Sequence, residues 1–223
     1  MKSKTKVYLG CAAMLLAMIG DYLLGVNAIG SSTDPDALYG IDWNMVPDWR
    51  YALSSILGFI SAALFAVAAV ELMKVLERDY GVKNGAFYKL FKIANWGGIL
   101  YFAFIHIGIC MLPVVFNAGM DAVGDLETAV IMTLRVGKSI IIPLALGFII
   151  CDGFVTVGWI GMILKGQLPL PKIALICNPV IIMLLGQLLN FVPFPFTGVD
   201  SGFESLGWLL LYAVAAGKLV KEG

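Results

Sequence analysis

Six long apolar runs constrain this chain more than any other feature of its sequence. They cover residues 7–29, 51–75, 91–115, 139–165, 172–192 and 205–220. Each is near the ~20 residues that a helix needs to cross the ~30 Å hydrocarbon core of a bilayer. Strands of a membrane barrel would be about 10 residues long and would alternate strictly in polarity. The sequence therefore predicts an all-α polytopic membrane protein, a bundle of six transmembrane helices that forms one integral membrane domain over residues 1–223.

The composition excludes several other classes of protein. Hydrophobic residues make up 60% of the chain and charged residues only 13%, whereas soluble domains carry roughly a quarter charged residues. A nucleic-acid-binding protein, a disordered protein and a secreted disulfide scaffold are therefore not expected. The four cysteines all lie in apolar runs, where we interpret them as small buried hydrophobic residues rather than disulfide partners.

The distribution of charge predicts the orientation of the bundle. Twelve of the 15 basic residues lie at the two termini, around the connection between the second and third runs, or around that between the fourth and fifth runs. The opposite side has nine acids and three basic residues, Arg50, Arg135 and Lys138. Cytoplasmic segments of membrane proteins are enriched in Lys and Arg. Both termini are therefore predicted to be cytoplasmic, which requires an even number of spans, in a multi-pass protein of the cell membrane.

The N-terminus also has some features of a secretory signal. Three lysines precede an apolar core, and Val26-Asn27-Ala28 could form a cleavage site. Because Asp21 interrupts the apolar run, a first span that stays in the protein is the favoured interpretation.

Three segments between the runs are predicted to be external. Residues 31–50 form a turn-rich loop, and residues 193–204 contain Pro193 and Pro195, which cannot continue a helix. Residues 116–138 are expected to form a second external segment, in which residues 125–134 could make a short helix at the membrane interface. Whether this segment spans, re-enters or lies at the interface is left open.

Polar side chains inside the apolar runs are the candidate functional residues. An Asp at mid-span costs ~2.5–3.5 kcal/mol on insertion scales, so such groups face each other or a wet cavity. At ~1.5 Å per residue, Asp21, His106 and Gln187 all lie about 20–22 Å above the cytoplasmic ends of their helices. We expect these three to share one layer, with Asn190 one turn above Gln187.

Two helices carry polar residues at helical spacing. Asn95, His106 and Asn117 are 11 residues apart, close to three whole turns, so they project from nearly one face. Asp152 on the fourth run lies about 20 Å below Lys138 at ~1.5 Å per residue, and this acid and this base could bracket a polar headgroup. The alternatives are that Asn and His merely bridge helices through hydrogen bonds and that Asp152 forms a structural ion pair.

The chemistry that these residues favour is acid–base catalysis. No P-loop, GxSxG elbow or HExxH motif is present, and neither a metal site nor a cofactor is predicted. A buried carboxyl group exchanges protons near neutral pH when a second carboxylate or an imidazole takes the complementary role. This would suit hydrolysis or isomerisation of a lipid, and equally a proton relay in a transporter.

Three short motifs resemble those of the lysoplasmalogenase-like membrane proteins. Gly20-Asp21-Tyr22-Leu23-Leu24 resembles their GD-x-L-L motif, the segment from Gly98 to His106 resembles G-x-x-x-F-x-x-x-H, and the segment from Gly147 to Asp152 resembles G-x-x-x-S-D, with Cys151 in place of the serine. That family has about eight helices and carries its GD motif well inside the chain. The sequence is also similar to uncharacterised bacterial multi-pass membrane families with an early GD motif.

The resemblance implies hydrolysis of the vinyl-ether bond of lysoplasmalogens. It makes Asp21 and Asp152 the catalytic acid–base pair and His106 a lining or orienting residue. From the residues themselves we expect an enzyme, a lipid hydrolase or isomerase, whose substrate is oriented by Gln187, Asn190 and Asn117 and held at an anionic headgroup by Arg135 and Lys138.

Two other classes of function stay open at this stage. One is a small-molecule or proton-coupled transporter or binding protein that uses the same cavity, and the other is a non-catalytic accessory membrane subunit. The expected partners are a lipid or another hydrophobic small molecule and the membrane itself, with no nucleic acid. The sequence leaves the choice between a monomer and a homo-oligomer open.

Overall fold

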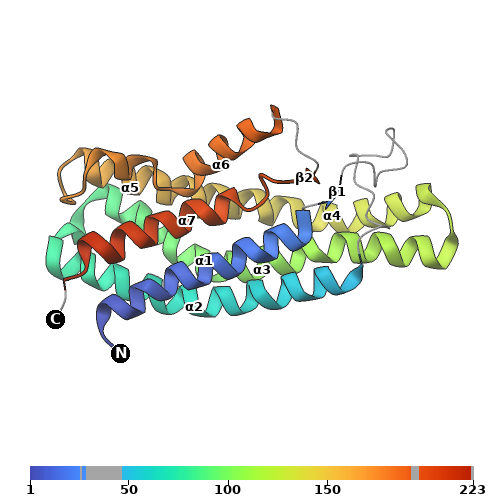
Figure 1. The fold of residues 1–223 in the computed structure, drawn as a ribbon, viewed down its shortest axis with the longest axis horizontal. Helices are drawn as coiled ribbons and strands as arrows, with labels where there is room; N and C mark the ends of the chain where they lie inside the picture. Colours follow the sequence, from blue (N-terminus) through green and yellow to red (C-terminus); the bar gives the residue numbers. More distant parts are fainter. Residues whose placement is uncertain (26, 29–46, 192–195, 222–223) are drawn as a thin grey trace.

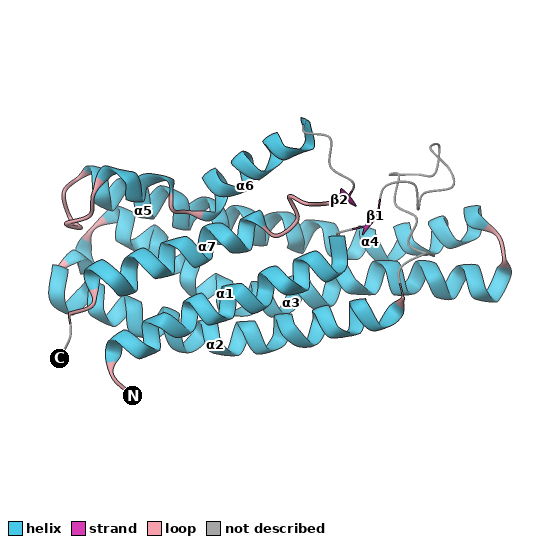
Figure 2. Ribbon diagram, in the orientation of Figure 1, coloured by secondary structure: helices cyan, strands magenta, loops and turns pink. Residues whose placement is uncertain are grey.

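The computed structural model describes residues 1–25, 27–28, 47–191 and 196–221, which form an elongated bundle of helices (Figure 1). Figure 2 shows that helices make up nearly all of the drawn ribbon. The α-helices are α1 (Ser3–Gly25), α2 (Asp48–Tyr80), α3 (Ala86–Val123), α4 (Leu126–Phe148), α5 (Phe154–Leu164), α6 (Pro179–Gln187) and α7 (Phe203–Val214). The shorter helical turns are η2 (Val82–Asn84), η3 (Ile149–Gly153), η4 (Lys172–Ile176), η5 (Leu188–Phe191) and η6 (Ala215–Leu219).

Four of the described helices are long and apolar enough to cross a membrane. They are Ser3–Gly25, Asp48–Tyr80, Ala86–Val123 and the continuous helical stretch Leu126–Leu164. The predicted all-helical membrane architecture is confirmed at this level. These helices contain the first four apolar runs, apart from the last few residues of the first run and Lys165, and they extend the second and third runs by several residues at each end.

The α3–α4 hairpin differs from the prediction for residues 116–138. Instead of a separate external segment, residues 116–123 continue α3 and residues 126–138 begin α4. A tight turn separates the helices: Gly124 adopts a left-handed conformation with φ 68°, and Asp125 accepts a hydrogen bond from the Thr128 backbone at 2.9 Å. Hydrogen bonds from Thr128 lower the pKa of Asp125, so its carboxylate is a good N-cap for α4 at neutral pH.

The fifth apolar run does not form one continuous helix. The 3₁₀ turn η4 ends before Asn178, whose side chain accepts a hydrogen bond from the Ile181 backbone and so caps α6. Pro179 follows as the first residue of α6, a position where its missing N–H is not needed. The sixth run forms α7 and continues into the π-helical turn η6.

The first predicted external loop lies largely outside the described residues. Of the segment 31–50, only residues 47–50 are described, and α2 begins within them at Asp48. In the segment 193–204, residues 196–202 are described before α7 begins, and the short strand β2 (Phe196–Thr197) pairs antiparallel with β1 (Asn27–Ala28). This pairing joins the end of α1 to the segment that precedes α7.

A buried aromatic cluster holds α2, α3 and α7 together. Phe65 packs edge-on against Phe102, with ring centroids 4.7 Å apart, and against Trp208 at 5.4 Å. Trp208 also packs edge-on against Phe102 and stacks with Tyr212. Edge-to-face pairs of this kind are favourable beyond the apolar area that they bury. The cluster fixes α7 against the two longest helices, and α7 supplies much of the site described below.

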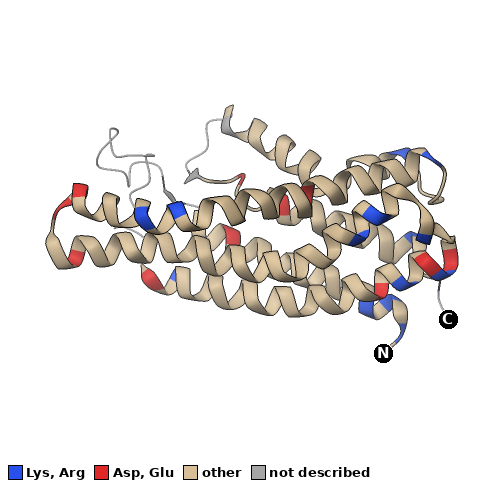
Figure 3. Ribbon diagram, turned by 180° about the vertical axis from the view of Figure 1, so that it is seen from behind, with Lys and Arg blue, Asp and Glu red and all other residues tan. Residues whose placement is uncertain are grey.

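Both termini lie at the same end of the bundle (Figure 1). Figure 3 shows that most Lys and Arg residues gather at this end, whereas the far end of the α3–α4 hairpin carries acids. The asymmetry that the sequence predicted is therefore present along the long axis of the folded molecule.

Close packing of α5 against α3 gives the first prediction. A Cβ atom on Gly158 would lie 2.7 Å from the Phe87 carbonyl oxygen and 2.8 Å from the Phe91 backbone nitrogen. Because backbone atoms cannot move aside cheaply, we expect Gly158→Ala to destabilise the protein by about 1–3 kcal/mol. Thermal or denaturant unfolding in detergent micelles measures this change.

Gly137→Ala is the matched control, because a Cβ there would meet only a Leu112 methyl group at an ordinary 3.8 Å. Equal stability of the two variants would contradict the observed approach of α5 to α3.

Candidate functional site

A cavity of about 220 Å³ lies between α1, α3 and the N-terminal part of α7. Two carboxylic acids, one imidazole and two hydroxyl groups reach its wall, together with apolar side chains. The residues that line it are Asp21, Leu24, Gly25, Phe102, Ile105, His106, Ile109, Ser201, Glu204 and Ser205. Polar groups from three separate helices therefore converge on one hollow in an otherwise apolar bundle.

Asp21 and His106 meet at the wall of this cavity. The Asp21 Oδ1 and His106 Nε2 atoms are 3.5 Å apart, and the side chains are 20% and 5% exposed. The imidazole fits because its neighbours are small: a Cβ on Gly58 of α2 would lie 2.2 Å from the His106 Cβ. Gly20 of α1 lies on another side of the imidazole, where an added Cβ would come within 3.2 Å of it. The glycines thus define a slot that holds the histidine toward Asp21.

Two serines around the start of α7 bind the same aspartate. The Ser205 hydroxyl donates to Asp21 Oδ2 at 2.6 Å, and the Ser201 hydroxyl lies 3.3 Å from the Asp21 backbone oxygen. Asp21 therefore has one carboxylate oxygen bound by α7 and the other facing the imidazole of α3. This leaves its position fixed by three helices.

A second acidic group adjoins the cavity through Glu204. Asp152 is completely buried in the π-helical turn η3, where its Oδ1 accepts a hydrogen bond from the indole N–H of Trp208 at 2.6 Å. Its other oxygen, Oδ2, has no hydrogen-bond partner among the described residues, and the carboxyl group of Glu204 lies close enough to interact with that of Asp152 electrostatically. Two acids are therefore neighbours where the wall of the cavity meets the core.

The location of Asp152 has a local cause. The turn Ile149–Gly153 is a π-helix, which inserts an extra residue into the stretch from α4 to α5. Such insertions shift the faces of a helix and occur frequently at functional sites. Farther along, the Thr156 hydroxyl donates a hydrogen bond to the Asn178 side-chain oxygen, and the Trp159 indole N–H donates one to the Ala174 carbonyl. These two residues thus attach α5 to the segment before α6.

The predicted polar stripe of α3 divides into three separate environments. His106 reaches the cavity, whereas Asn95 accepts a hydrogen bond from the Tyr212 hydroxyl at 2.7 Å in the buried core. Asn117 donates to Asp48 at 2.8 Å near the start of α2. Asn95 and Asn117 therefore bridge helices through hydrogen bonds, which is one of the two alternatives that the sequence left open. His106 lines the cavity, which is the other.

The other predicted substrate-binding residues do not line this cavity. Gln187 donates to Asp200 at 2.8 Å in an exposed contact, and Arg135 and Lys138 are exposed on α4. The side chain of Asn190 lies outside the described residues. A role for any of these residues in substrate binding stays a prediction.

Sequence reasoning did not select Glu204, Ser201 or Ser205 as site residues. The sequence places Glu204 in the predicted external segment 193–204, as one of the nine acids on the side opposite most of the basic residues. A signal was present, since Glu204 and Trp208 are four residues apart and share a helix face. Which face turns inward depends on the packing of α7, and no pattern in the sequence fixes that packing.

No metal centre forms in the part of the chain that the structure describes: three or more His, Cys, Asp or Glu side chains do not come together there in a way that could hold an ion. All four cysteines are free thiols, of which Cys110 and Cys151 are buried. The described site consists of proton-exchanging and hydrogen-bonding groups.

The fold and this cavity define a helical protein of membrane type with an internal acid–histidine site. The chain belongs to a family of unknown function (DUF6796), whose model matches residues 1–222. No curated protein and no solved structure matches the chain.

The Asp152–Trp208 hydrogen bond gives the second prediction. Replacing Trp208 by Phe keeps an aromatic ring but removes the indole N–H that donates to an oxygen of the fully buried Asp152 carboxyl group. We expect Trp208→Phe to lower the free energy of unfolding by about 1–3 kcal/mol. Unfolding in detergent micelles measures the loss.

Trp96→Phe serves as the control, because Trp96 is 52% exposed. A Trp208 variant as stable as the Trp96 variant would show that the indole N–H contributes nothing to holding Asp152.

Proposed function

We propose that this protein is a membrane-embedded enzyme that acts on a lipid-like substrate by aspartate and histidine acid–base chemistry. The observation that carries the proposal is the Asp21–His106 contact, at 3.5 Å, on the wall of a cavity inside an apolar bundle. A carboxylate beside an imidazole is a recurring arrangement for proton transfer, and such contacts tighten when substrate binds.

The roles of the groups follow from their partners. Ser205 and Ser201 hold Asp21 in place, and Asp21 orients the imidazole of His106, which acts as the base toward water or a substrate hydroxyl. Glu204 is the acid that reaches the cavity, and Asp152 is a positioning residue that interacts with Glu204 electrostatically without lining the cavity. Separate environments for two acids favour separate acid and base roles.

The substrate that the sequence resemblance favours is a lysoplasmalogen. In that reaction Glu204 would protonate the outer carbon of the vinyl-ether double bond, which leaves an oxocarbenium carbon. Water would then attack this carbon while His106 takes the proton from the water. The hemiacetal so formed would collapse to a fatty aldehyde as its hydroxyl proton passes to the leaving glycerol oxygen. The proton held by His106 would then return to Glu204, which restores both groups.

Activity measurements test this proposal directly. The purified protein is incubated with a vinyl-ether lysophospholipid, and aldehyde release is followed for the wild type and for Asp21→Asn, His106→Gln and Glu204→Gln. Loss of a general acid or base lowers the rate by about 10²–10⁴-fold. We expect losses in this range for all three variants, with folding unchanged in size-exclusion chromatography.

Asp121→Asn is the matched control, because Asp121 is an exposed acid of α3 away from the cavity. An ester lysophospholipid of the same chain length separates vinyl-ether hydrolysis from general lipase activity. Full activity in the Asp21 and His106 variants would rule out the proposed roles, and the absence of aldehyde release by the wild type would rule out this substrate.

Proton-coupled transport is a second candidate that one observation favours. Glu204 lines the cavity, and the neighbouring Asp152 is fully buried away from it. Intramembrane acids of this kind also occur in proton relays. Proton movement into proteoliposomes in the presence of a solute, without chemical change of that solute, would favour transport over catalysis.

We propose further that the chain crosses the cell membrane six times and has both termini in the cytoplasm. Support comes from the two termini at one end of the bundle, the concentration of basic residues there, and the helical stretches 179–191 and 203–219 that follow the four long helices. The fifth helical stretch is short for a span, and local thinning of the bilayer accommodates such a stretch.

Reporter fusions test this topology. Alkaline phosphatase is active only outside the cytoplasm, so we expect activity when it is inserted at the Gly124–Asp125 turn and none when it is fused to the C-terminus. Green fluorescent protein at the C-terminus should fluoresce. The reverse pattern, or activity at both positions, would contradict the proposed orientation.

A further inference from the structure

The turn of α1 that carries Asp21 is tied to α2 on both sides of the aspartate. The Ser54 hydroxyl of α2 donates to the Gly20 carbonyl at 2.9 Å, and the Arg50 guanidinium, one turn earlier on α2, donates to the Tyr22 carbonyl at 3.2 Å. Gly20 and Tyr22 flank Asp21 directly in the sequence. Side chains of α2 therefore hold the backbone of α1 just before and just after the aspartate.

Of these two donors, Ser54 is the one in the interior of the bundle. Its side chain is 0% exposed, whereas Arg50 is only half-buried. Serine hydroxyls commonly form hydrogen bonds between helices in membrane proteins. A buried hydroxyl that loses its partner is costly, because no water is at hand to replace the bond. The contact between Ser54 and the Gly20 carbonyl is therefore a fixed point between α1 and α2.

Ser54 also lies close to the imidazole of His106. A Cβ atom on Gly20 would come within 3.3 Å of Ser54 Oγ and within 3.2 and 3.3 Å of the Cε1 and Nδ1 atoms of His106. The hydroxyl and the imidazole thus border the same small space, which the absent side chain of Gly20 leaves open. Gly58, one turn after Ser54 on α2, bounds the imidazole on another side. The distance between α1 and α2 at this level therefore determines the room that the imidazole has.

We propose that Ser54 is a positioning residue for the Asp21–His106 pair. Its hydrogen bond sets the distance between α1 and α2 at Gly20, and this distance decides how closely the Asp21 carboxyl group approaches the imidazole. Ser54 does not line the cavity, so it acts through the backbone of α1 and not on a bound ligand. The inference rests on the proposed function, but the contact of the imidazole with Asp21 can be measured without any substrate.

The composition of the chain makes this measurement direct, because His106 is its only histidine. The full-length protein is produced with ¹⁵N-labelled histidine and purified through an affinity tag that contains none, so all imidazole signals come from His106. NMR spectra in lipid bilayers then report the two ring nitrogens separately, since each signal depends on the hydrogen bond and the proton at that atom. The Nε2 atom lies 3.5 Å from Asp21 Oδ1, so its signal probes this contact. The Asp21→Asn variant shows where the signal lies once the carboxylate is lost.

Two substitutions of Ser54 separate the hydrogen bond from the volume of the side chain. In Ser54→Ala we expect the Nε2 signal to move about halfway to its position in Asp21→Asn, because one hydrogen bond between helices is lost while the carboxyl group stays. Ser54→Cys fills a similar space with a much weaker donor, so its spectrum should resemble that of Ser54→Ala. In the aldehyde-release assay, kcat of Ser54→Ala should fall about fivefold with KM unchanged, which corresponds to about 1 kcal/mol.

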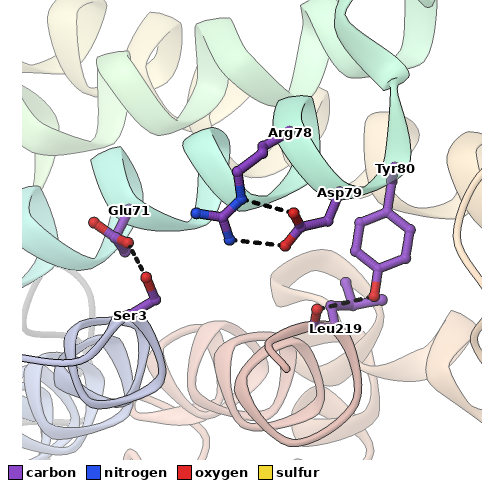
Figure 4. Close-up of polar contacts among 6 residues, drawn as sticks. All are labelled: Ser3, Glu71, Arg78, Asp79, Tyr80 and Leu219. Atoms are coloured by element: carbon purple, nitrogen blue, oxygen red, sulfur yellow. Dashed lines mark hydrogen bonds and ion pairs between the residues drawn. The ribbon is translucent and has the colours of Figure 1, made fainter. Parts of the chain in front are cut away.

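Ser3→Ala is the matched control for a general loosening of the bundle. Ser3 also joins α1 to α2, through a hydrogen bond from its hydroxyl to Glu71, but at the end of the bundle that carries both termini (Figure 4). Its loss removes a contact between the same two helices far from the cavity. Both imidazole signals of His106 should therefore stay where they are in the wild type.

Three results would overturn the inference. An unchanged Nε2 signal in Ser54→Ala would show that the hydrogen bond does not position the pair. An equal displacement in Ser3→Ala would assign the effect to loosening of α1 against α2, and a wild-type spectrum of Ser54→Cys would assign it to side-chain volume. If Ser54→Ala fails to fold, Ser54→Cys is compared with Asp21→Asn in its place. Absence of aldehyde release by the wild type would rule out the proposed substrate, and the spectra would still decide the role of Ser54.

Discussion

The need to satisfy polar groups inside an apolar bundle organises this structure. A buried polar group without a hydrogen-bond partner is costly, and water is scarce in such an interior. The polar residues on the inner side of α7 each meet a group from another helix: Ser205 binds Asp21, Trp208 binds Asp152 and Tyr212 binds Asn95. The shortest of the predicted spans is thereby joined to α1, η3 and α3, and the candidate site lies where these contacts begin.

Small residues determine where the polar groups can meet. Gly58 gives room to the His106 side chain, and Gly10 lies so close to the ring of Tyr212 that a Cβ there would come within 2.2 Å of it. Small residues let helices approach closely in membrane proteins, where apolar surface alone gives little drive for association. The same close approach that packs the bundle also brings the imidazole to Asp21, so packing and candidate chemistry depend on the same positions.

The molecule carries two polar regions with different chemistry. The cavity at Asp21 is lined by acids, hydroxyls and one imidazole together with apolar side chains, which suits proton exchange with a bound group that is partly apolar. A separate cleft, at the end of the bundle that carries both termini, is lined by lysine, arginine and hydroxyl side chains.

The sequence by itself determined the helical membrane-type architecture, the approximate bounds of the long helices and the common level of Asp21 and His106, because apolar length and position along a helix are local properties of the chain. It did not determine that residues 116–138 extend two helices, that the fifth run breaks at Asn178, or that Glu204 faces inward. These features depend on the rotation of one helix against another and on the π-helical turn at Asp152. Only tertiary packing decided them, because side chains of neighbouring helices, distant in sequence, select which face is buried.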